Sequence, residues 1–151
     1  MCLCKIFIFQ TVNSNYSILK HAYGVTEFGK TIGGYTPLKW STAGAWTNDT
    51  TKNSFLLSLD LRQKMTLIIP QYAINCNSNY GSTFGGGADI FIADKCNQNQ
   101  SSYANFPHSY NYSSKPYTAN QQSYTAFSGA TANYNFRVTE YEVFKVVYEQ
   151  L

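Results

Sequence analysis

The chain has 151 residues, which is the length of one domain with a single modest hydrophobic core. Charged residues make up 13% of the chain and the formal net charge is +3, without the clustered basic patch that nucleic-acid-binding proteins usually carry. We therefore expect no nucleic-acid partner. No segment approaches the roughly 20 apolar residues of a membrane helix, so we also expect no membrane insertion.

The chain opens with a short apolar run, CLCKIFIF at residues 2–9. The run is too short for a good signal-peptide core, and no small-residue cleavage pattern follows it. The four cysteines of the chain are Cys2, Cys4, Cys76 and Cys96. They include no C-x-x-C pair, and the spacing of Cys76, Cys96 and His108 matches no standard zinc motif. We expect reduced thiols in an intracellular, cytoplasmic protein, and no metal ion or cofactor.

Residues 24–31, GVTEFGKT, fit the pattern G-x-x-x-x-G-K-[ST] of the phosphate-binding loop. Such a loop needs a helix that begins at the lysine and directs its N-terminus at the phosphates. Gly33, Gly34 and Pro37 follow the lysine here, and each of them disfavours a helix. The sequence therefore argues against nucleotide binding at this stretch.

The same stretch predicts a β-hairpin. Its first strand ends near Glu27, its turn is FGK at residues 28–30, and its second strand is TIGGYT at residues 31–36. Lys30 then lies in the turn, and we expect its side chain to be solvated, with no part in the fold or in partner binding.

Four further stretches predict strands. Residues 55–61 and 65–70 are apolar runs separated by the polar residues RQK, which predicts a second hairpin. Residues 88–94, ADIFIAD, lie between a glycine run and polar residues and predict a strand. The longest extended stretch covers residues 133–148, and its alternation changes phase near Thr139, which predicts a bend or a bulge.

Residues 95–129 hold five tyrosines and two prolines but no apolar period, which predicts a long loop between the last two strands. No segment has a helical apolar stripe over three turns. The aromatic and β-branched residues favour strands, and the chain has 13 tyrosines. We therefore predict a mainly β protein, built as a sandwich of two sheets over one core.

Five segments, in order along the chain, resemble the TLDc domain, the module of the oxidation-resistance proteins. They are FGKTIGGYTPLKW (28–40), NSFLLSLDL (53–61), YGSTFGGGADIFIAD (80–94), SSYANFPHSY (101–110) and ANYNFRVTEYEVFKV (132–146). The residues that match the family motifs, most of which we expect to be structural, are Gly33, Gly34, Tyr35, Thr36, Trp40, Asp49, Phe55, Phe84, Gly85, Gly87, Asp89, Glu140, Glu142 and Phe144. Ser82 stands where the family usually has a proline.

The resemblance implies a TLDc-like β-sandwich of two antiparallel sheets with few short helices over residues 26–151. Residues 1–25 do not resemble the opening of the family domain, and we expect a divergent or truncated segment there. For function, the resemblance implies a non-enzymatic interaction module linked to protection against oxidative stress. Some family members bind the vacuolar proton pump and promote its disassembly, so subunits of that pump are the expected protein partner.

Several motif residues have a structural and a functional interpretation. Gly33, Gly34 and the glycines at 85–87 could let a ligand approach the backbone, although such glycines more often supply positive φ at bulges and turns. Trp40 and Trp46 are candidate partner anchors, because tryptophan is enriched in binding hot spots, and core packing is the competing interpretation.

A weak antioxidant or hydrolytic enzyme is the alternative function. Asp89, Glu140 and Glu142 could serve as acid and base, but carboxylates at turns and on exposed strand faces are commoner. Redox chemistry at Cys76 or Cys96 would require a setting that stabilises a thiolate. No spacing in the sequence indicates a Ser-His-Asp assembly, and no catalytic residue is assigned.

Overall fold

The computed structural model describes residues 5–8, 19–42, 44–112, 118, 121–131 and 135–146. Within them, the chain forms two β-sheets that enclose one hydrophobic core, together with a short helix and a 3-10 turn. The predicted class, a mainly β sandwich with few helices, is confirmed.

The larger sheet has seven strands, and the smaller sheet has six. The order in the larger sheet is β1 (Lys5–Ile8), β13 (Val138–Val146), β2 (Leu19–Thr26), β3 (Thr31–Thr36), β5 (Phe55–Ser58), β6 (Gln63–Leu67) and β11 (Tyr110–Asn111). The order in the smaller sheet is β12 (Asn135–Phe136), β10 (Ser102–Tyr103), β9 (Ile90–Phe91), β8 (Thr83–Phe84), β7 (Ile74–Cys76) and β4 (Ala45–Thr47). The described neighbours pair antiparallel, except that β1 runs parallel to β13.

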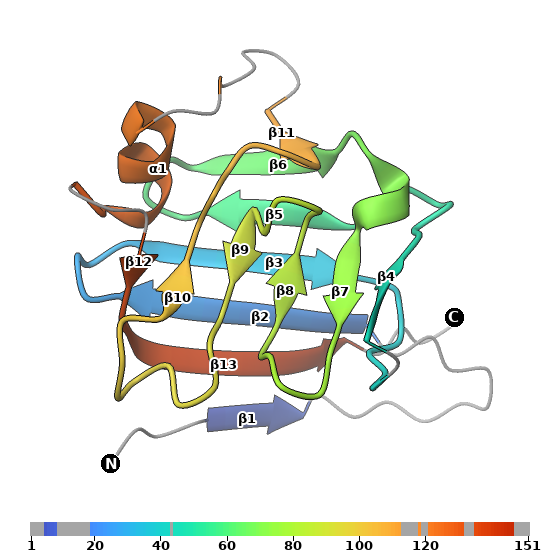
Figure 1. The fold of residues 1–151 in the computed structure, drawn as a ribbon, viewed down its shortest axis with the longest axis horizontal. Coiled ribbons are helices and arrows are strands. Elements are labelled where there is room, and N and C mark those ends of the chain that lie inside the picture. The colour runs from blue at the N-terminus through green and yellow to red at the C-terminus, as the bar shows by residue number, and fades with distance from the viewer. Residues whose placement is uncertain are drawn as a thin grey trace.

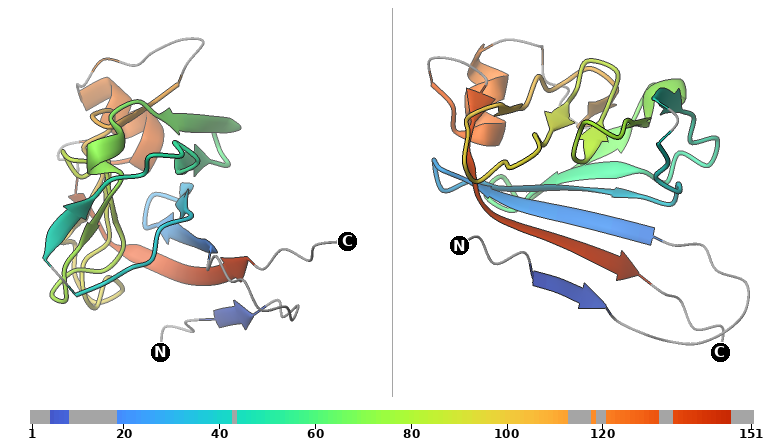
Figure 2. Two further views of the ribbon diagram at one scale, coloured as in Figure 1. Left: turned by 90° about the vertical axis from the view of Figure 1, so that its right-hand side faces the viewer. Right: turned by 60° about the horizontal axis from the view of Figure 1, so that its bottom comes forward.

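The two sheets form two layers, and helix α1 (Gln121–Ser128) covers one end of the sandwich (Figure 1). Figure 2 shows the layers from the side, with β13 and β1 at the end of the larger sheet. Buried side chains fill the space between the sheets, among them Ile32, Leu56 and Met65 from the larger sheet and Ile74 and Phe84 from the smaller. This apolar burial is the main favourable term for such a fold.

The predicted hairpin at residues 24–36 is confirmed as β2, a turn and β3. The amide of Thr26 donates to the carbonyl of Lys30 (2.9 Å), and Gly29 adopts the positive φ of 74° that the turn requires. The residues after Lys30 form a strand where a phosphate loop would need a helix.

The second predicted hairpin is present as β5 and β6, but its turn lies earlier than expected. The turn covers residues 59–62, and the predicted turn residues Gln63 and Lys64 belong to β6. The shift follows from Arg62, whose φ of 51° closes the turn with a hydrogen bond from its amide to the carbonyl of Leu59.

The predicted strand at residues 88–94 is shorter than expected. Only Ile90 and Phe91 are in regular strand β9. Ala88 has a φ of 55° and donates its amide to the carbonyl of Gly85, because the chain is still turning there. The buried Asp89 is held by hydrogen bonds of its own, described below.

The long C-terminal stretch divides between the two sheets. β12 pairs with β10 in the smaller sheet, and β13 pairs with β2 in the larger one. The register of β13 shifts between Val138 and Glu140, so the bulge predicted near Thr139 is confirmed. The chain passes from the smaller sheet to the larger one between β12 and β13. The side chains on either side of this passage, Phe136 and Val138, are both buried in the core between the sheets.

The prediction of a long loop at residues 95–129 is wrong in part. The segment contains β10, β11 and α1. The eight residues of α1 lack an apolar stripe, and tertiary packing holds the helix: Phe127 is fully buried and stacks on Phe106 with ring centroids 5.0 Å apart. Gly129, with a φ of 84°, ends the helix and donates to the carbonyl of Thr125.

Candidate interaction surface

A glycine turn at residues 85–87 lies beside a buried carboxylate, Asp89. Gly85 has a φ of 81°, and a Cβ added to it would overlap the Asp89 carboxylate. A Cβ on Gly87 would lie 2.9 Å from the Cβ of His108. Glycine is therefore required for the chain to pass this close to its neighbours.

Asp89 ties the glycine turn to the segment before β11. Its side chain is completely buried, and its oxygens accept hydrogen bonds from the backbone amides of His108 and Ser109, the latter at 2.8 Å. Burial raises the pKa of Asp89 to about 7, although the backbone amides lower it in part. The Asp89 side chain thus joins two loops by hydrogen bonds, and its protonation state changes near pH 7.

His108 and Ser109 continue this cluster without forming a hydrolytic triad. The ring Nδ1 of His108 lies 2.9 Å from the Oγ of Ser109, which also accepts a hydrogen bond from the amide of Gly86 (2.8 Å). Ser109 is buried, and Asp89 contacts the backbone of His108 where a triad would need its ring. The cluster therefore fixes loop geometry.

The ring of His108 continues into a row of three neighbouring rings, and we name Trp46, Tyr72 and His108 the aromatic row. Trp46 lies on β4, and Tyr72 ends the 3-10 turn η1 (Pro70–Tyr72). The ring centroids of Trp46 and Tyr72 are 5.7 Å apart, and those of Tyr72 and His108 are 6.2 Å apart. Trp46 and Tyr72 are 37% and 39% exposed, which is high for aromatic side chains in contact.

The absence of a side chain at Gly86 lets the rings approach the backbone. A Cβ there would lie 2.9 Å from ring atoms of both Tyr72 and His108. Hydrogen bonds fix the backbone next to Tyr72. The amide of Gly85 donates to the carbonyl of Ala73, and the buried Tyr110 hydroxyl donates to the same carbonyl at 2.7 Å. The row is thus an exposed aromatic surface on a fixed support.

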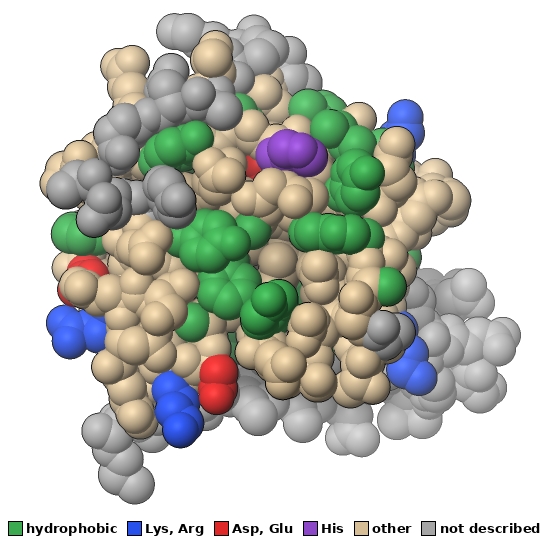
Figure 3. Space-filling model, viewed as in Figure 1, with side chains coloured by type: hydrophobic (Ala, Val, Ile, Leu, Met, Phe, Trp, Pro, Cys, Tyr) green, Lys and Arg blue, Asp and Glu red, His purple; other side chains and the backbone are tan. Residues whose placement is uncertain are grey.

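A second group of rings lies on the same sheet. Phe91 of β9 contacts Tyr80 at 5.1 Å and Tyr103 of β10 at 5.0 Å between ring centroids. Figure 3 shows this face of the molecule, where hydrophobic side chains gather over the smaller sheet beside a histidine and charged side chains lie mostly toward the margins. The face has the composition of an interface core, in which charges are depleted and aromatic residues are enriched.

Asp49 is a second buried carboxylate, and it organises the loop between β4 and β5. It accepts hydrogen bonds from the amide and hydroxyl of Thr51 (3.0 and 2.6 Å) and from the amide and hydroxyl of Ser54 (2.8 and 2.7 Å). The Ser54 hydroxyl also contacts the buried Thr36 (2.9 Å). Burial alone would raise the pKa of Asp49, but these hydrogen bonds outweigh it, and the pKa lies below its usual value.

Gly34, Phe84 and Trp40 form a stack through the sandwich. A Cβ on Gly34 would lie 2.7 Å from the ring of the buried Phe84, so the glycine makes room for this ring. The ring of Trp40 packs against the same ring at an angle of 80°, with centroids 5.6 Å apart. Phe84 is distant in sequence from Gly34 and Trp40, and it meets them because β3 and β8 face each other across the core.

The remaining motif residues lie on the larger sheet. Tyr35 and Phe55 stack at 4.8 Å across β3 and β5, and Gly33 pairs with Leu57. Glu140 is exposed and Glu142 is half-buried on β13, in a different sheet from the cluster around Asp89. The side chain of Phe144 lies outside the described residues.

Tyr72 and Ser109 were not singled out from the sequence, although both belong to the site. Tyr72 follows Pro70 in an irregular segment without periodicity. Ser109 lies in the motif SSYANFPHSY, and its buried hydroxyl is a tertiary feature that no local pattern reveals.

The thiol of Cys76 is buried, and its Sγ lies 3.5 Å from the hydroxyl of Thr47. Cys96 is half-buried. In the part of the chain that the structure describes, no three His, Cys, Asp or Glu side chains gather as a metal site, and no helix is long and apolar enough to cross a membrane.

Comparison with known protein families gives a match. The family model described as the TLDc domain matches residues 4–147, nearly the whole chain. The matched range includes most of the N-terminal segment that the motifs left aside. A search of curated protein sequences returned no match.

Proposed function

The chain belongs to the TLDc domain family, and from this premise we propose that it is a non-enzymatic interaction module that takes part in protection against oxidative stress. Its proposed partner is the vacuolar proton pump, which some members of the family bind and disassemble. The proposal places the chain in the cytoplasm, a compartment that keeps thiols such as Cys76 reduced.

The aromatic row is the observation that supports an interaction role. Tryptophan and tyrosine dominate the energy of protein interfaces because they bury a large area and lose little conformational freedom. Trp46 and Tyr72 present such area to solvent, and the ties to Ala73 and Asp89 hold their surroundings in place. A surface that is ordered before binding loses less entropy when the partner docks.

The test compares two exposed apolar positions. We expect Trp46→Ala and Tyr72→Ala each to weaken binding of the purified chain to purified proton pump at least tenfold, a loss of about 1.4 kcal/mol or more. Leu59→Ala is the matched control, because Leu59 is 57% exposed and lies in the β5–β6 turn of the larger sheet. Its affinity should change less than twofold. Binding is measured by calorimetry after circular dichroism has shown that each variant is folded.

Two results would oppose different parts of the proposal. If the unchanged chain does not bind the pump, the pump is not the partner. If it binds and neither aromatic variant weakens binding, the aromatic row is not the contact surface.

The non-enzymatic part is tested with a peroxide-consumption assay on the purified chain. We expect no consumption above the uncatalysed rate. Consumption that is lost in Cys76→Ser or Cys96→Ser would establish thiol chemistry and overturn this part of the proposal.

A further inference from the structure

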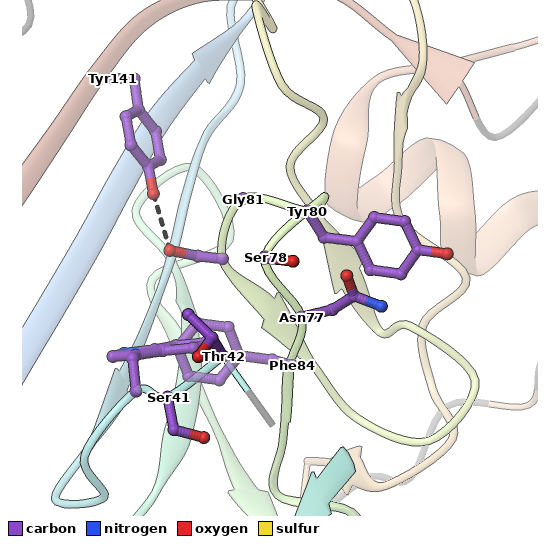
Figure 4. Close-up of a pocket in the computed structure, with 10 residues that line it drawn as sticks. Ser41, Thr42, Asn77, Ser78, Tyr80, Gly81, Phe84 and Tyr141 are labelled. Carbon is purple, nitrogen blue, oxygen red and sulfur yellow. Dashed lines mark hydrogen bonds between the residues drawn. The ribbon is translucent and has the colours of Figure 1, made fainter. Parts of the chain in front are cut away.

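A hollow opens between the loops of the smaller sheet and the end of the larger sheet, on another part of the molecule from the aromatic row. Its cavity volume is about 370 Å³, within the range of small-molecule sites. Tyr141 reaches it from β13 and hydrogen-bonds to Ser82 (2.7 Å), with Phe84 and Thr42 across the hollow (Figure 4).

The lining of the hollow is aromatic and hydroxylic, without a charged side chain among its described residues. Rings come from Trp40, Phe84, Tyr80 and Tyr141. Hydroxyl and amide groups come from Ser41, Thr42, Asn77, Ser78 and Ser82. This set offers flat apolar faces together with neutral hydrogen-bond donors and acceptors. It lacks the cations that a phosphate or a carboxylate ligand would need.

A second hollow of about 720 Å³ adjoins the first. Ser78, Tyr80, Gly81 and Tyr141 line both, so the two hollows meet along these residues, and we treat them as the two halves of one groove. The second half adds amide side chains at Asn79, Asn97 and Gln98, and one charge of each sign at Asp94 and Lys95. A ligand with two linked units could therefore extend from the aromatic half into the amide-rich half.

We propose that this groove binds a neutral saccharide of two or more units. The C–H face of a pyranose ring is apolar and packs against an aromatic ring, and its hydroxyls pair with hydroxyl and amide side chains. Trp40 supplies the ring, and Phe84 packs against it with the two ring planes 80° apart. Tyr141 and Ser82 supply a pair of hydroxyls already oriented toward each other.

The two tryptophans of the chain give a direct readout. In Trp46→Phe, Trp40 is the single tryptophan and reports on the groove. We expect its fluorescence to change saturably with cellobiose, maltose or chitobiose, with a dissociation constant on the order of 1 mM. Glucose 6-phosphate should bind no more tightly than glucose, because the aromatic half has no charged lining and the charges of Asp94 and Lys95 in the other half offset each other.

Blocking the groove provides the control. Ser78 is exposed and lines both halves, so Ser78→Arg in the Trp46→Phe background should weaken saccharide binding at least tenfold. Ser101→Arg adds the same side chain at an exposed position outside the lining and should leave binding unchanged. Calorimetry on the unmodified chain checks that the response is binding.

The proposal is overturned if none of the three saccharides gives a saturable response, or if Ser78→Arg binds as well as Ser101→Arg. Tighter binding of the phosphorylated sugar would also overturn it. The pump-binding assay is independent, because the aromatic row and the groove do not share a residue.

Discussion

At the scale of single residues, two buried carboxylates and a few glycines determine how the loops of the smaller sheet are placed. Asp49 has four hydrogen bonds from Thr51 and Ser54, and its pKa is low. Asp89 is equally buried, but its backbone partners do not compensate its burial, and its pKa is raised. At neutral pH the side chain of Asp49 is therefore ionised, whereas that of Asp89 is partly protonated.

Comparing alanine substitutions at Gly85 and Gly29 separates the cost of a positive φ from the cost of a steric clash. Gly85→Ala introduces a Cβ at a φ of 81° that also overlaps the Asp89 carboxylate. Gly29→Ala meets a similar φ of 74° with nothing within 4 Å. We expect about 1 kcal/mol of destabilisation for Gly29→Ala and at least about 3 kcal/mol for Gly85→Ala in urea unfolding. Equal losses would contradict the close approach of Asp89.

The raised pKa of Asp89 predicts a dependence of stability on pH. Its pKa is about 7 in the folded chain and about 3.9 in an unfolded one, so between these values the folded state binds more protons. The contribution of Asp89 is therefore fully present below about pH 4 and is lost as the pH rises through about 7, with a slope of up to about 1.4 kcal/mol per pH unit.

Asp89→Asn tests this dependence by urea unfolding at a series of pH values. The variant should be less stable overall, because the amide nitrogen of asparagine cannot accept from a backbone donor, whereas both oxygens of Asp89 can. Its stability should lack the decline between pH 4 and pH 7 that the unchanged chain shows. An identical pH profile in both proteins would contradict the raised pKa.

At the scale of elements, the local patterns predicted the long strands well and the short ones poorly. The hairpin of β2 and β3 is encoded by its own turn, FGK, and the alternation of residues 133–148 revealed the bulge near Thr139. Strands β8 to β12 have two residues each, too few for a period. Helix α1 depends on Phe127 packing against Phe106, a contact across 21 positions that no local pattern contains.

The site could be predicted only in part for the same reason. The motif glycines and Asp89 were found by their order along the chain, but their roles depend on neighbours from other elements. Gly34 is needed because Phe84 lies over it, and Gly86 because two rings meet there. Such reasons exist only once the strands are paired.

The lysine of the apparent phosphate loop belongs to the hairpin, and we predict a small effect of its removal. The Nζ of Lys30 forms an ion pair with the Oδ1 of Asp60 at 3.6 Å, and both side chains are partly exposed. Lys30→Ala should cost less than about 1 kcal/mol in thermal unfolding. Asp60→Ala should cost more, because it also removes the acceptor for the amide of Thr31 (2.7 Å). Loss of pump binding in Lys30→Ala would show that this residue has a role beyond the turn.

At the scale of the whole molecule, the described segments nearest the two ends of the chain lie side by side. β1 pairs with residues 142–145 of β13, so the edge of the larger sheet there is a strand of four residues in place of one of nine (Figure 1). An uncovered strand edge is a template for pairing with another chain. Because a short edge strand is a poorer template than a long one, we predict that β1 protects the sandwich from self-association.

Deletion of residues 1–8 tests this role of β1. Since β13 still pairs with β2 along its length, we expect the truncated chain to fold. It should self-associate at concentrations where the full chain is monomeric, as measured by analytical ultracentrifugation. Deletion of residues 1–4, which leaves β1 in place, is the control. A monomeric truncated chain would show that β1 does not protect this edge.

The contacts of Asp89 also bear on how this family member could acquire new partners. The carboxylate accepts from the backbone amides at positions 108 and 109, and every residue except proline offers such an amide. The side chain at position 108 can therefore be exchanged while the loop keeps its anchor. Selection can change the chemistry at this end of the aromatic row independently of the scaffold, so the surface that the row offers can diverge while the sandwich stays the same.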